Sequence, residues 1–410
     1  MPEFFNVLPP ENALRILLDR LDPHVETERV ATSGAVGRVT TGAIVPLEDL
    51  PALPRSTMDG YSVRASDTFG ASEGLPAYLD VVGEVPMGRL PAVGVSEGQS
   101  ALAHTGGLLA DGADAVVMVE QTQRLGPAAI EVVRPVAPGE NVIQVGEDTR
   151  AGDPVLAPGH VLRPQDLGGL LALGFAEVEV ARKPVVSIVS TGDELVAPDA
   201  APAPGQIRDV NTYTISALVE SCGGVSNVVA LVADDYDAQR SAAVEGLAGG
   251  DMLVFSAGSS VSSRDLTARV LSDLGAPGVL VHGISIKPGK PTIVALLDGK
   301  PAFGLPGNPV SAAVVFDLLV RPTVYALSGC ALAPRPPMLR ARLSRDIASV
   351  AGREDYVQVR LAGQDGSLAA EPVFGKSNLI FTMVRADGVV RVPLDAGGLY
   401  AGDEVDVRVY

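Results

Sequence analysis

The chain has 410 residues and a formal net charge of −18, from 49 acidic and 31 basic side chains. This length is sufficient for several domains with ample hydrophobic cores. The acidic balance argues against nucleic acid as a partner, because binding to phosphate backbones requires a basic surface. Cys222 and Cys330 are the two cysteines, without a CxxC or Cys/His cluster. This pattern argues against a zinc site and fits a reducing compartment.

The hydropathy pattern gives no reason to expect a membrane protein. The composition is 47% hydrophobic, but no apolar run has the length needed to span a bilayer. The first residues lack the basic segment that begins a signal peptide. We therefore expect a cytoplasmic protein with no membrane partner.

The N-terminal part predicts a helix followed by a β-rich insertion. Residues 9–22 place four leucines at helical spacing, which indicates an amphipathic helix. Residues 79–135 are strand-like apart from the stretch that follows His104. We expect a β domain of residues 46–141, inserted into an elongated first domain formed by residues 1–45 and 142–181.

From Pro184 the pattern becomes α/β. Strand-like runs alternate with segments of helical character, and this alternation favours a mostly parallel sheet with ligands at the carboxyl ends of its strands. The expected strands are 185–190, 225–232, 251–256 and 279–286, and the expected helices are 211–221, 236–247 and 265–274. We assign this domain to residues 182–329.

Polar residues follow the expected strands. Thr191, Gly192 and Glu194 follow the first strand, and Asp234 follows the second. Residues 256–265, which include Ser256, Gly258 and Asp265, follow the third. The carboxylates are interleaved with Ser, Thr and Gly residues of the kind found in phosphate-binding turns. The alternative is a rim of solvated turn residues.

Residues 281–313 contain the densest candidate site. Two apolar runs, 292–297 and 302–305, are bounded by Gly/Pro turns and are read as buried strands. Pro306, Gly307 and Asn308 then precede a helix with Asn308 as the N-cap and Pro309 at the first position. A helix start of this kind binds anions, and Lys287 and Lys290 can supply charge to the same anion. The alternative is that these are ordinary turns with solvated lysines.

After a proline-rich linker, the C-terminal part is strand-like again. Residues 339–343, 356–361, 368–372 and 404–409 alternate and are separated by turns. This pattern predicts a small β-barrel over residues 335–410. Ser377 lies in a Gly-Lys-Ser-Asn segment that reads on its own as a turn.

Four motifs in this order carry a family resemblance: STMDGY (56–61), STGDEL (190–195), IKPGKP (286–291) and GLPGNP (304–309). Together they resemble the MoeA/gephyrin E-domain family of molybdopterin molybdenumtransferases. The resemblance implies a central α/β domain like that of MoaB and MogA proteins, with an inserted β domain and a C-terminal β-barrel. It also implies a reaction that inserts molybdate into adenylylated molybdopterin, with Mg²⁺, and releases AMP.

The resemblance also assigns roles to individual residues. The implied catalytic residues are Asp59, Glu194 and Asp265, and the implied metal ligands are Asp234 and Asp265. The implied substrate-binding residues are Thr105, Asp148, Thr191, Gly192, Ser256, Gly258, Lys287, Lys290, Pro306, Gly307, Asn308 and Ser377. For Asp59, Asp148 and Ser377, the local alternative is a plain turn residue.

Two departures from the family pattern bear on the substrate contacts. The family usually has a paired glycine where this chain reads SAGSSVSSRD (256–265), so serine hydroxyls replace bare backbone and limit close approach. Arg264 in this segment can add a bidentate phosphate contact. Gly283 stands where many members carry a basic residue.

The resemblance further implies a homodimer with shared active sites, in which Asp59 and Thr105 come from the partner chain. The expected partners in the pathway are a molybdopterin adenylyltransferase and proteins that deliver the product to molybdoenzymes. Two other functions stay open: the adenylyltransferase step itself, and a non-catalytic scaffold of the same fold.

Overall fold

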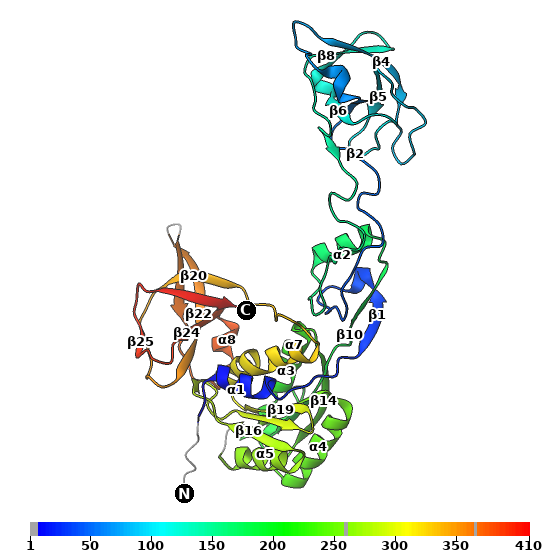
Figure 1. Cartoon of the computed structure of the whole chain (residues 1–410). Helices are drawn as coiled ribbons and strands as arrows, with labels where there is room; N and C mark the ends of the chain where they lie inside the picture. The colour runs from blue at the N-terminus through cyan, green and yellow to red at the C-terminus, as the bar shows by residue number, and fades with distance from the viewer. Residues whose placement is uncertain (1–6, 258–260, 365–366) are drawn as a thin grey trace. The chain divides into compact units, whose positions relative to one another are not determined.

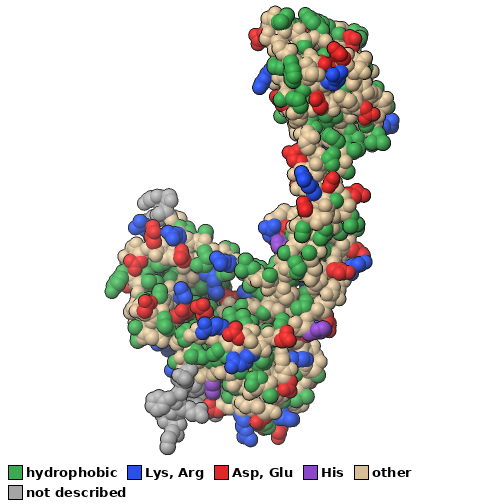
Figure 2. All heavy atoms as spheres, viewed as in Figure 1, with side chains coloured by type: hydrophobic (Ala, Val, Ile, Leu, Met, Phe, Trp, Pro, Cys, Tyr) green, Lys and Arg blue, Asp and Glu red, His purple; other side chains and the backbone are tan. Residues whose placement is uncertain are grey.

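The computed structural model describes residues 7–257, 261–364 and 367–410 (Figure 1). The chain forms two compact units. The first consists of Met1–Gly42, Pro158–Leu167 and Ala176–Tyr410, and the second of Ala43–Ala157 and Gly168–Phe175. This division does not separate the four domains expected from the sequence, so their boundaries stay predictions. Acidic and basic side chains are interspersed on the visible face (Figure 2).

The centre of the first unit is a six-stranded sheet, and it confirms the mostly parallel α/β fold. In spatial order its strands are β14 (Val225–Val232), β11 (Val185–Thr191), β15 (Met252–Ala257), β19 (Lys300–Pro306), β18 (Ile293–Leu297) and β16 (Pro277–His282). The first four are mutually parallel, and only β18 is antiparallel to both of its neighbours.

Alternation along the strands places a hydrophobic core on each face of this sheet. On β15, Met252 and Val254 pack on one face and Leu253 and Phe255 on the other. The first face is covered by α1 (Pro10–Leu18), α3 (Asn211–Ser221) and a long apolar helix. The second is covered by α4 (Tyr236–Gly249) and α5 (Val261–Asp273).

The long helix consists of α6 (Pro309–Val315), a π-helical turn η4 (Phe316–Val320) and α7 (Arg321–Leu327). Within the described residues it is the one helix that is long and apolar enough to cross a membrane, with a mean hydropathy of 1.6. Burial explains this composition, because the helix packs into the core beneath the sheet. Its Val315, Phe316 and Leu319 are fully buried.

The expected strand 279–286 is wrong as a single element. The chain leaves the central sheet at His282, the end of β16, and Ile286–Lys287 forms a separate short strand, β17. β17 pairs with β22 of the C-terminal barrel, with Lys287 opposite Asp355. A segment of the α/β domain therefore extends the barrel's sheet.

The C-terminal region is a closed barrel, as expected. Around it run β22 (Glu354–Gln364), β23 (Ser367–Pro372), β20 (Met338–Leu343), β26 (Glu404–Val409) and β24 (Gly388–Val392), and a β22–β24 pairing closes the circle. Alternate residues such as Val390, Val392, Val405 and Val407 fill its core. Two short strands, β21 (Ile347–Ala348) and β25 (Gly398–Leu399), pair beside it, and α8 (Phe381–Val384) follows β23.

The second unit contains a six-stranded sheet with the order β6 (Ala115–Met118), β3 (Gly60–Val63), β5 (Gln99–Ala103), β4 (Ala77–Glu84), β8 (Ala129–Val132) and β7 (Thr122–Arg124). Tyr61, Val63, Val117 and Ile130 are buried in its core. Outside this sheet, β2 (Arg55–Ser56) pairs with β9 (Val142–Ile143). Two 3-10 turns, η2 (Ala65–Thr68) and η3 (Val119–Gln121), connect strands of this unit. The helix α2 (Pro164–Ala172) is divided between the two units.

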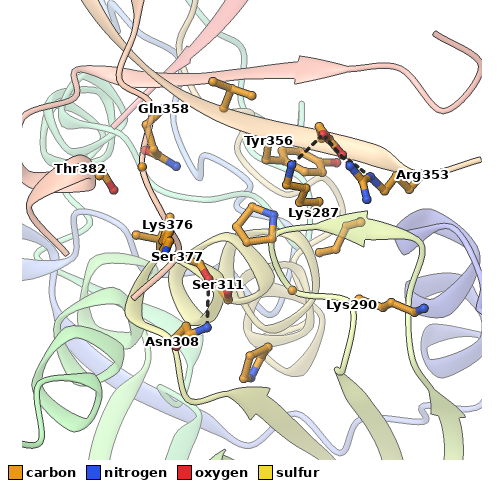
Figure 3. Close-up of a pocket in the computed structure, with 18 of the residues that line it drawn as sticks. Lys287, Lys290, Asn308, Ser311, Arg353, Tyr356, Gln358, Lys376, Ser377 and Thr382 are labelled. Atoms are coloured by element: carbon orange, nitrogen blue, oxygen red, sulfur yellow. Dashed lines mark hydrogen bonds and ion pairs between the residues drawn. The ribbon is translucent and has the colours of Figure 1, made fainter. Parts of the chain in front are cut away.

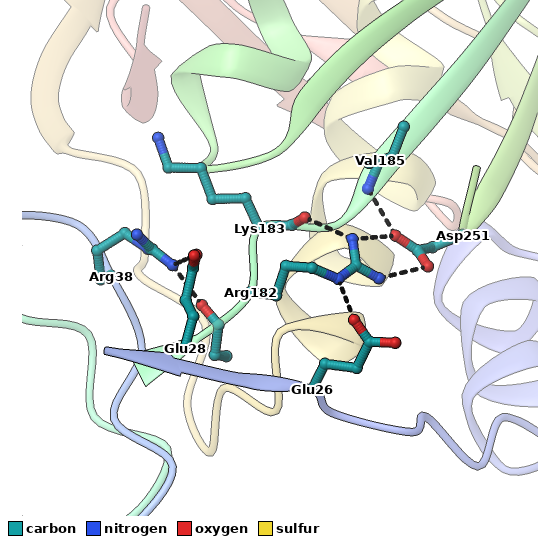
Figure 4. Close-up of polar contacts among 8 residues, drawn as sticks. Glu26, Glu28, Arg38, Arg182, Lys183, Val185 and Asp251 are labelled. Carbon is teal, nitrogen blue, oxygen red and sulfur yellow. Dashed lines mark hydrogen bonds and ion pairs between the residues drawn. The ribbon is translucent and has the colours of Figure 1, made fainter. Parts of the chain in front are cut away.

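The first unit also includes the antiparallel pair β1 (Thr27–Ala31) and β10 (Glu177–Ala181). A 3-10 turn, η1 (Thr32–Gly34), follows β1. Arg182 joins this pair to the central sheet (Figure 4). Its guanidinium donates to both oxygens of Asp251 at 2.9 and 3.1 Å and to Glu26 at 2.6 Å. Asp251 also accepts from the Val185 N–H at 2.7 Å. One arginine therefore fixes the entry into β11.

Candidate functional site

The carboxyl ends of the parallel strands converge at one edge, as the sequence predicts. Thr191 ends β11 opposite Val232 on β14, and Ala257 ends β15 opposite Pro306 on β19. Adjacent strands are about 4.8 Å apart, so these four ends lie within roughly 15 Å. The turns that leave them form a continuous rim.

The turn after β11 depends on Gly192. Its φ is +154°, and a Cβ at this position would lie 2.8 Å from the Glu194 carboxylate oxygen Oε2. The absence of a side chain therefore lets the half-buried Glu194 fold back over the end of the strand. A short parallel pair, β12 (Leu195–Val196) and β13 (Ile207–Arg208), continues from this turn.

Asn211, the first residue of α3, links two parts of the rim. Its Nδ2 donates to Ser256 Oγ and to the Gly307 carbonyl, both at 2.8 Å. The amide therefore ties the end of β15 to the turn before α6. The Asn211 residue is 6% exposed, so these bonds lie in protein interior.

Three polar atoms at this edge are buried and have no hydrogen-bond partner among the described residues: Ser190 Oγ, Thr191 Oγ1 and Asn211 Oδ1. Buried polar atoms in native proteins are normally paired with protein, water or a ligand. Ser190 is in register with Ser256, so both point to the sheet face that carries α3. These atoms are available to hold a bound molecule or ordered water.

Carboxylates gather beside the ends of β11 and β14. The Asp234 N–H donates to Asp193 Oδ1 at 3.1 Å, which joins the two turns.

The sequence predicts a helix that begins at Asp265, but α5 already begins at Val261. Asp265 therefore lies in the second turn of α5, where it is exposed. In the described parts of the chain, no three His, Cys, Asp or Glu residues form a ready metal site. Gly258 lies outside the described residues.

A pocket of about 880 Å³ lies on the other side of the rim, between the α/β domain and the barrel (Figure 3). One wall consists of residues 285–291 and the turn into α6, and the other of β22 and the segment before α8. The β17–β22 pairing explains this arrangement, because it fixes the lysine segment against the barrel. Lys287, Lys290, Pro306, Gly307, Asn308 and Ser377 all line this pocket.

The pocket is electropositive although the chain is acidic. Among its lining residues, Lys287, Lys290, Arg353 and Lys376 are basic and Asp355 is acidic. Asp355 is buried and pairs with Arg353 at 2.8 Å and with Lys287 at 3.9 Å. Three positive charges in excess suit a ligand with phosphate groups.

The predicted N-cap of α6 is confirmed at Asn308, although its side chain has another role. It occupies the N-cap position of α6, and Pro309 follows it as expected, but its side chain makes no capping bond. Instead its Nδ2 donates to Ser377 Oγ at 3.0 Å, and the Val310 N–H donates to the Ser377 carbonyl at 3.1 Å. A barrel residue thus replaces the local cap and holds the pocket's two walls together.

Asp59 and Thr105 form a pair in the second unit. The Thr105 N–H and Oγ1 donate to Asp59 Oδ1 at 2.8 and 3.1 Å. These two bonds hold the pKa of the exposed Asp59 carboxyl below its ordinary value. His104 bonds Glu84 at 2.8 Å, in agreement with a surface role. Asp148 is exposed in a separate turn, where its N–H bonds the Leu50 carbonyl.

Most of the expected site residues thus fall into three groups: the rim (Thr191, Gly192, Glu194, Asp234 and Ser256), the pocket, and the pair in the second unit. Asp148 lies in a separate turn of the second unit, Asp265 lies on α5, and Gly258 is outside the described residues. Sequence reasoning missed Asn211, Arg353, Lys376 and Gln358. Lys376 is next to Ser377, which the sequence did indicate. The other three residues have no local signal, because their place in the site depends on residues that are distant in the sequence.

Comparison with known proteins accounts for nearly the whole chain. Residues 8–174 match the family model for the MoeA N-terminal region (domains I and II), residues 187–326 match the one described as "Probable molybdopterin binding domain", and residues 340–410 match the MoeA C-terminal region (domain IV). A protein of Nostoc sp. named molybdopterin molybdenumtransferase is 32% identical, over 96% of this chain and 91% of its own. The Staphylococcus aureus protein of that name is 29% identical over 98% and 95%.

A solved structure of a molybdopterin biosynthesis MoeA protein from Pyrococcus horikoshii gives a TM-score of 0.86 at 32% identity, covering 99% of this chain and 100% of the other. A second structure of the protein from this genus gives 0.81 at 35% identity, with coverage of 98% and 99%. Likeness of sequence, domain order and fold over the full length of both chains shows that this protein belongs to the MoeA family.

Proposed function

We propose that this chain is a molybdopterin molybdenumtransferase that takes adenylylated molybdopterin and molybdate, releases AMP and leaves molybdenum on the pterin's dithiolene. The observation that carries the proposal is the electropositive pocket beside the carboxylate rim. Cleavage of a phosphoanhydride requires positive charge against the negative oxygens that develop in the transition state. The pocket offers Lys287, Lys290, Arg353 and Lys376 for that purpose.

The residues of the rim have complementary roles in this reaction. Asp234 and Asp265 are the oxygen ligands for Mg²⁺, and Thr191, Gly192 and Ser256 offer neutral hydrogen-bonding groups to the substrate. Mg²⁺ typically binds one or two carboxylates together with substrate phosphates and water, which suits two carboxylates beside a phosphate-binding site. When bound, the ion supplies Lewis-acid stabilisation of a phosphoryl oxygen. Glu194 holds and orients a proton of a water or molybdate oxygen.

Two features favour this activity over the adenylyltransferase step. Matches to MoeA regions extend through residues 8–174 and 340–410, beyond the α/β domain. The barrel also supplies one wall of the pocket, including Arg353 and Ser377. An adenylyltransferase has no need of these parts.

The direct test incubates the pure protein with adenylylated molybdopterin, Mg²⁺ and either molybdate or tungstate, and follows AMP release. Release that depends on the oxyanion supports the proposal and shows the preferred metal. A parallel reaction with ATP and molybdopterin tests for the adenylyltransferase. If neither reaction proceeds although the protein binds the pterin nucleotide, the proposed activity is wrong and the scaffold reading gains support.

The proposal includes a homodimer in which Asp59 and Thr105 of one chain complete the site of the other. Asp59 is an exposed carboxylate already oriented by two hydrogen bonds. It belongs to the second compact unit, whereas every residue that lines the pocket belongs to the first. Asp148 is also in that unit, and we assign it a lesser substrate contact.

Complementation tests this shared site. Asp59→Ala and Glu194→Ala are each expected to be inactive alone. With subunit exchange, half of the dimers are mixed, and each mixed dimer holds one intact site, so activity recovers to roughly a quarter of wild type. A mixture that stays inactive although mass spectrometry shows exchange would place both residues in one chain's site.

A further inference from the structure

Gln358 is a polar residue of the pocket with half of its amide unused. It lies on β22, is 4% exposed and lines the pocket (Figure 3). Its Oε1 accepts a hydrogen bond from the Tyr410 hydroxyl. Its Nε2 is buried and has no hydrogen-bond partner in the described ranges of the chain.

Tyr410 fixes which end of the amide faces the pocket. Burial raises the pKa of Tyr410 to about 12, so its hydroxyl keeps its proton at neutral pH. In this structure that hydroxyl donates to Oε1. Both N–H bonds of Nε2 are then left for another acceptor.

A buried amide donor without an acceptor is unfavourable, and native proteins rarely leave one unpaired. Ser285 Oγ, on the opposite wall, is a second buried atom that lines the pocket and has no partner among the described residues. Two such atoms in one cavity are available to form hydrogen bonds with a bound ligand. An apolar surface lies beside Gln358, because the Val373 N–H bonds the Gln358 carbonyl and Val373 and Phe374 line the same pocket.

We propose that Gln358, oriented by Tyr410, is a specificity-determining residue that donates hydrogen bonds to a neutral acceptor on the pterin ring. The four basic residues are the better partners for phosphate, since a neutral amide adds no charge. A pterin offers a ring carbonyl and ring nitrogens as neutral acceptors, and its flat faces match the apolar surface beside the amide. This inference rests on the proposed function and names the part of the substrate that the barrel wall recognises.

Binding measurements on full-length variants test the assignment. Gln358→Met keeps the side-chain length and removes the donor, Gln358→Glu replaces the donor by an acceptor, and Tyr410→Phe removes only the hydroxyl that orients the amide. Calorimetry measures the Kd for adenylylated molybdopterin and for AMP, which lacks the pterin. We expect Gln358→Met and Gln358→Glu to raise the Kd for the pterin nucleotide at least tenfold and Tyr410→Phe to raise it several-fold. The Kd for AMP should change less than twofold.

Thr382→Val is the matched control, because Thr382 lines the same pocket but its hydroxyl already donates to the Leu379 carbonyl. Thermal melts identify any variant that fails to fold. If one Gln358 variant fails, the other Gln358 variant and Tyr410→Phe decide the result. An unchanged Kd for the pterin nucleotide in both Gln358 variants overturns the inference. An equal loss for AMP also overturns it, because the amide would then contact the nucleotide. A wild-type protein that binds AMP but not the pterin nucleotide would refute the proposed function itself.

Discussion

Lys287→Met removes one positive charge from the pocket and keeps most of the side chain's length. Lys287 is 61% exposed and lies 3.9 Å from Asp355 Oδ2. An exposed ion pair of this kind contributes about 0–1 kcal/mol to stability. Its loss does not leave Asp355 unpaired, because Arg353 donates to both carboxylate oxygens, at 2.8 and 3.4 Å. The substitution should therefore lower the free energy of unfolding by less than about 1 kcal/mol.

The effect on ligand binding should be larger. A hydrogen bond between an ammonium group and a phosphate contributes about 1.5–3 kcal/mol, which corresponds to a roughly 10- to 150-fold change in Kd. Calorimetry with adenylylated molybdopterin measures this change, and a thermal melt measures stability. Arg340→Met is the matched control, because Arg340 forms a similar exposed ion pair on the barrel at 3.6 Å and does not line the pocket.

Salt adds an independent check, since ions screen the attraction between an exposed lysine and a phosphate. The wild-type Kd should rise as ionic strength rises, and Lys287→Met should reduce that dependence. The reasoning is refuted if the variant's Kd stays within twofold of wild type, or if Arg340→Met weakens binding equally.

Three further predictions concern the rim, the Arg182 contacts and the second unit. Asp265→Asn should lower AMP release by orders of magnitude with a nearly unchanged melt, and normal rates in EDTA-treated buffer would contradict the metal role. Asp251→Ala removes the carboxylate that accepts two bonds from Arg182 and should lower the free energy of unfolding by about 2 kcal/mol. Glu26→Ala removes the exposed partner of Arg182 and should lower it by less than about 1 kcal/mol. Equal losses in denaturant titrations would contradict this difference. Thr105→Val should raise the pKa of Asp59 toward its ordinary value, because it removes one donor to the charged form. Carboxyl ¹³C NMR titration measures this shift, and the wild-type carboxylate should stay ionised to lower pH than the variant's.

The sequence was sufficient where short-range patterns decide the structure. Alternation of apolar strands with helices predicted α3 and β14 at their observed bounds and predicted that the ends of the parallel strands meet at one edge of the sheet. Two-residue alternation and turns likewise predicted the barrel. These features depend on burial and backbone preferences that act within a few residues.

The sequence was insufficient where a distant partner decides the contacts. Asn308 is the N-cap that its local pattern predicts, but its side-chain bond to Ser377, 69 residues later, has no local signal. Residues 279–286 have the pattern of one strand, but the pairing of Ile286 with Glu354 on β22 divides them. The roles of Asn211 and Gln358 depend in the same way on Gly307 and Tyr410. These strand pairings and side-chain bonds form only when the domains assemble, so no local sequence pattern predicts them.

The candidate site separates charges of opposite sign along one edge. Carboxylates of Asp193, Glu194 and Asp234 gather at the ends of β11 and β14, and the basic residues lie in the pocket beyond β19. The elements between them present neutral groups: Ser190, Ser256, and Asn211 with its bond to Gly307. Asn211, Ser190 and Ser256 add no charge between the two groups. In the proposed function, this neutral strip keeps the cations available for phosphate and the carboxylates available for a metal ion, which would let a chain of net charge −18 bind an anionic substrate.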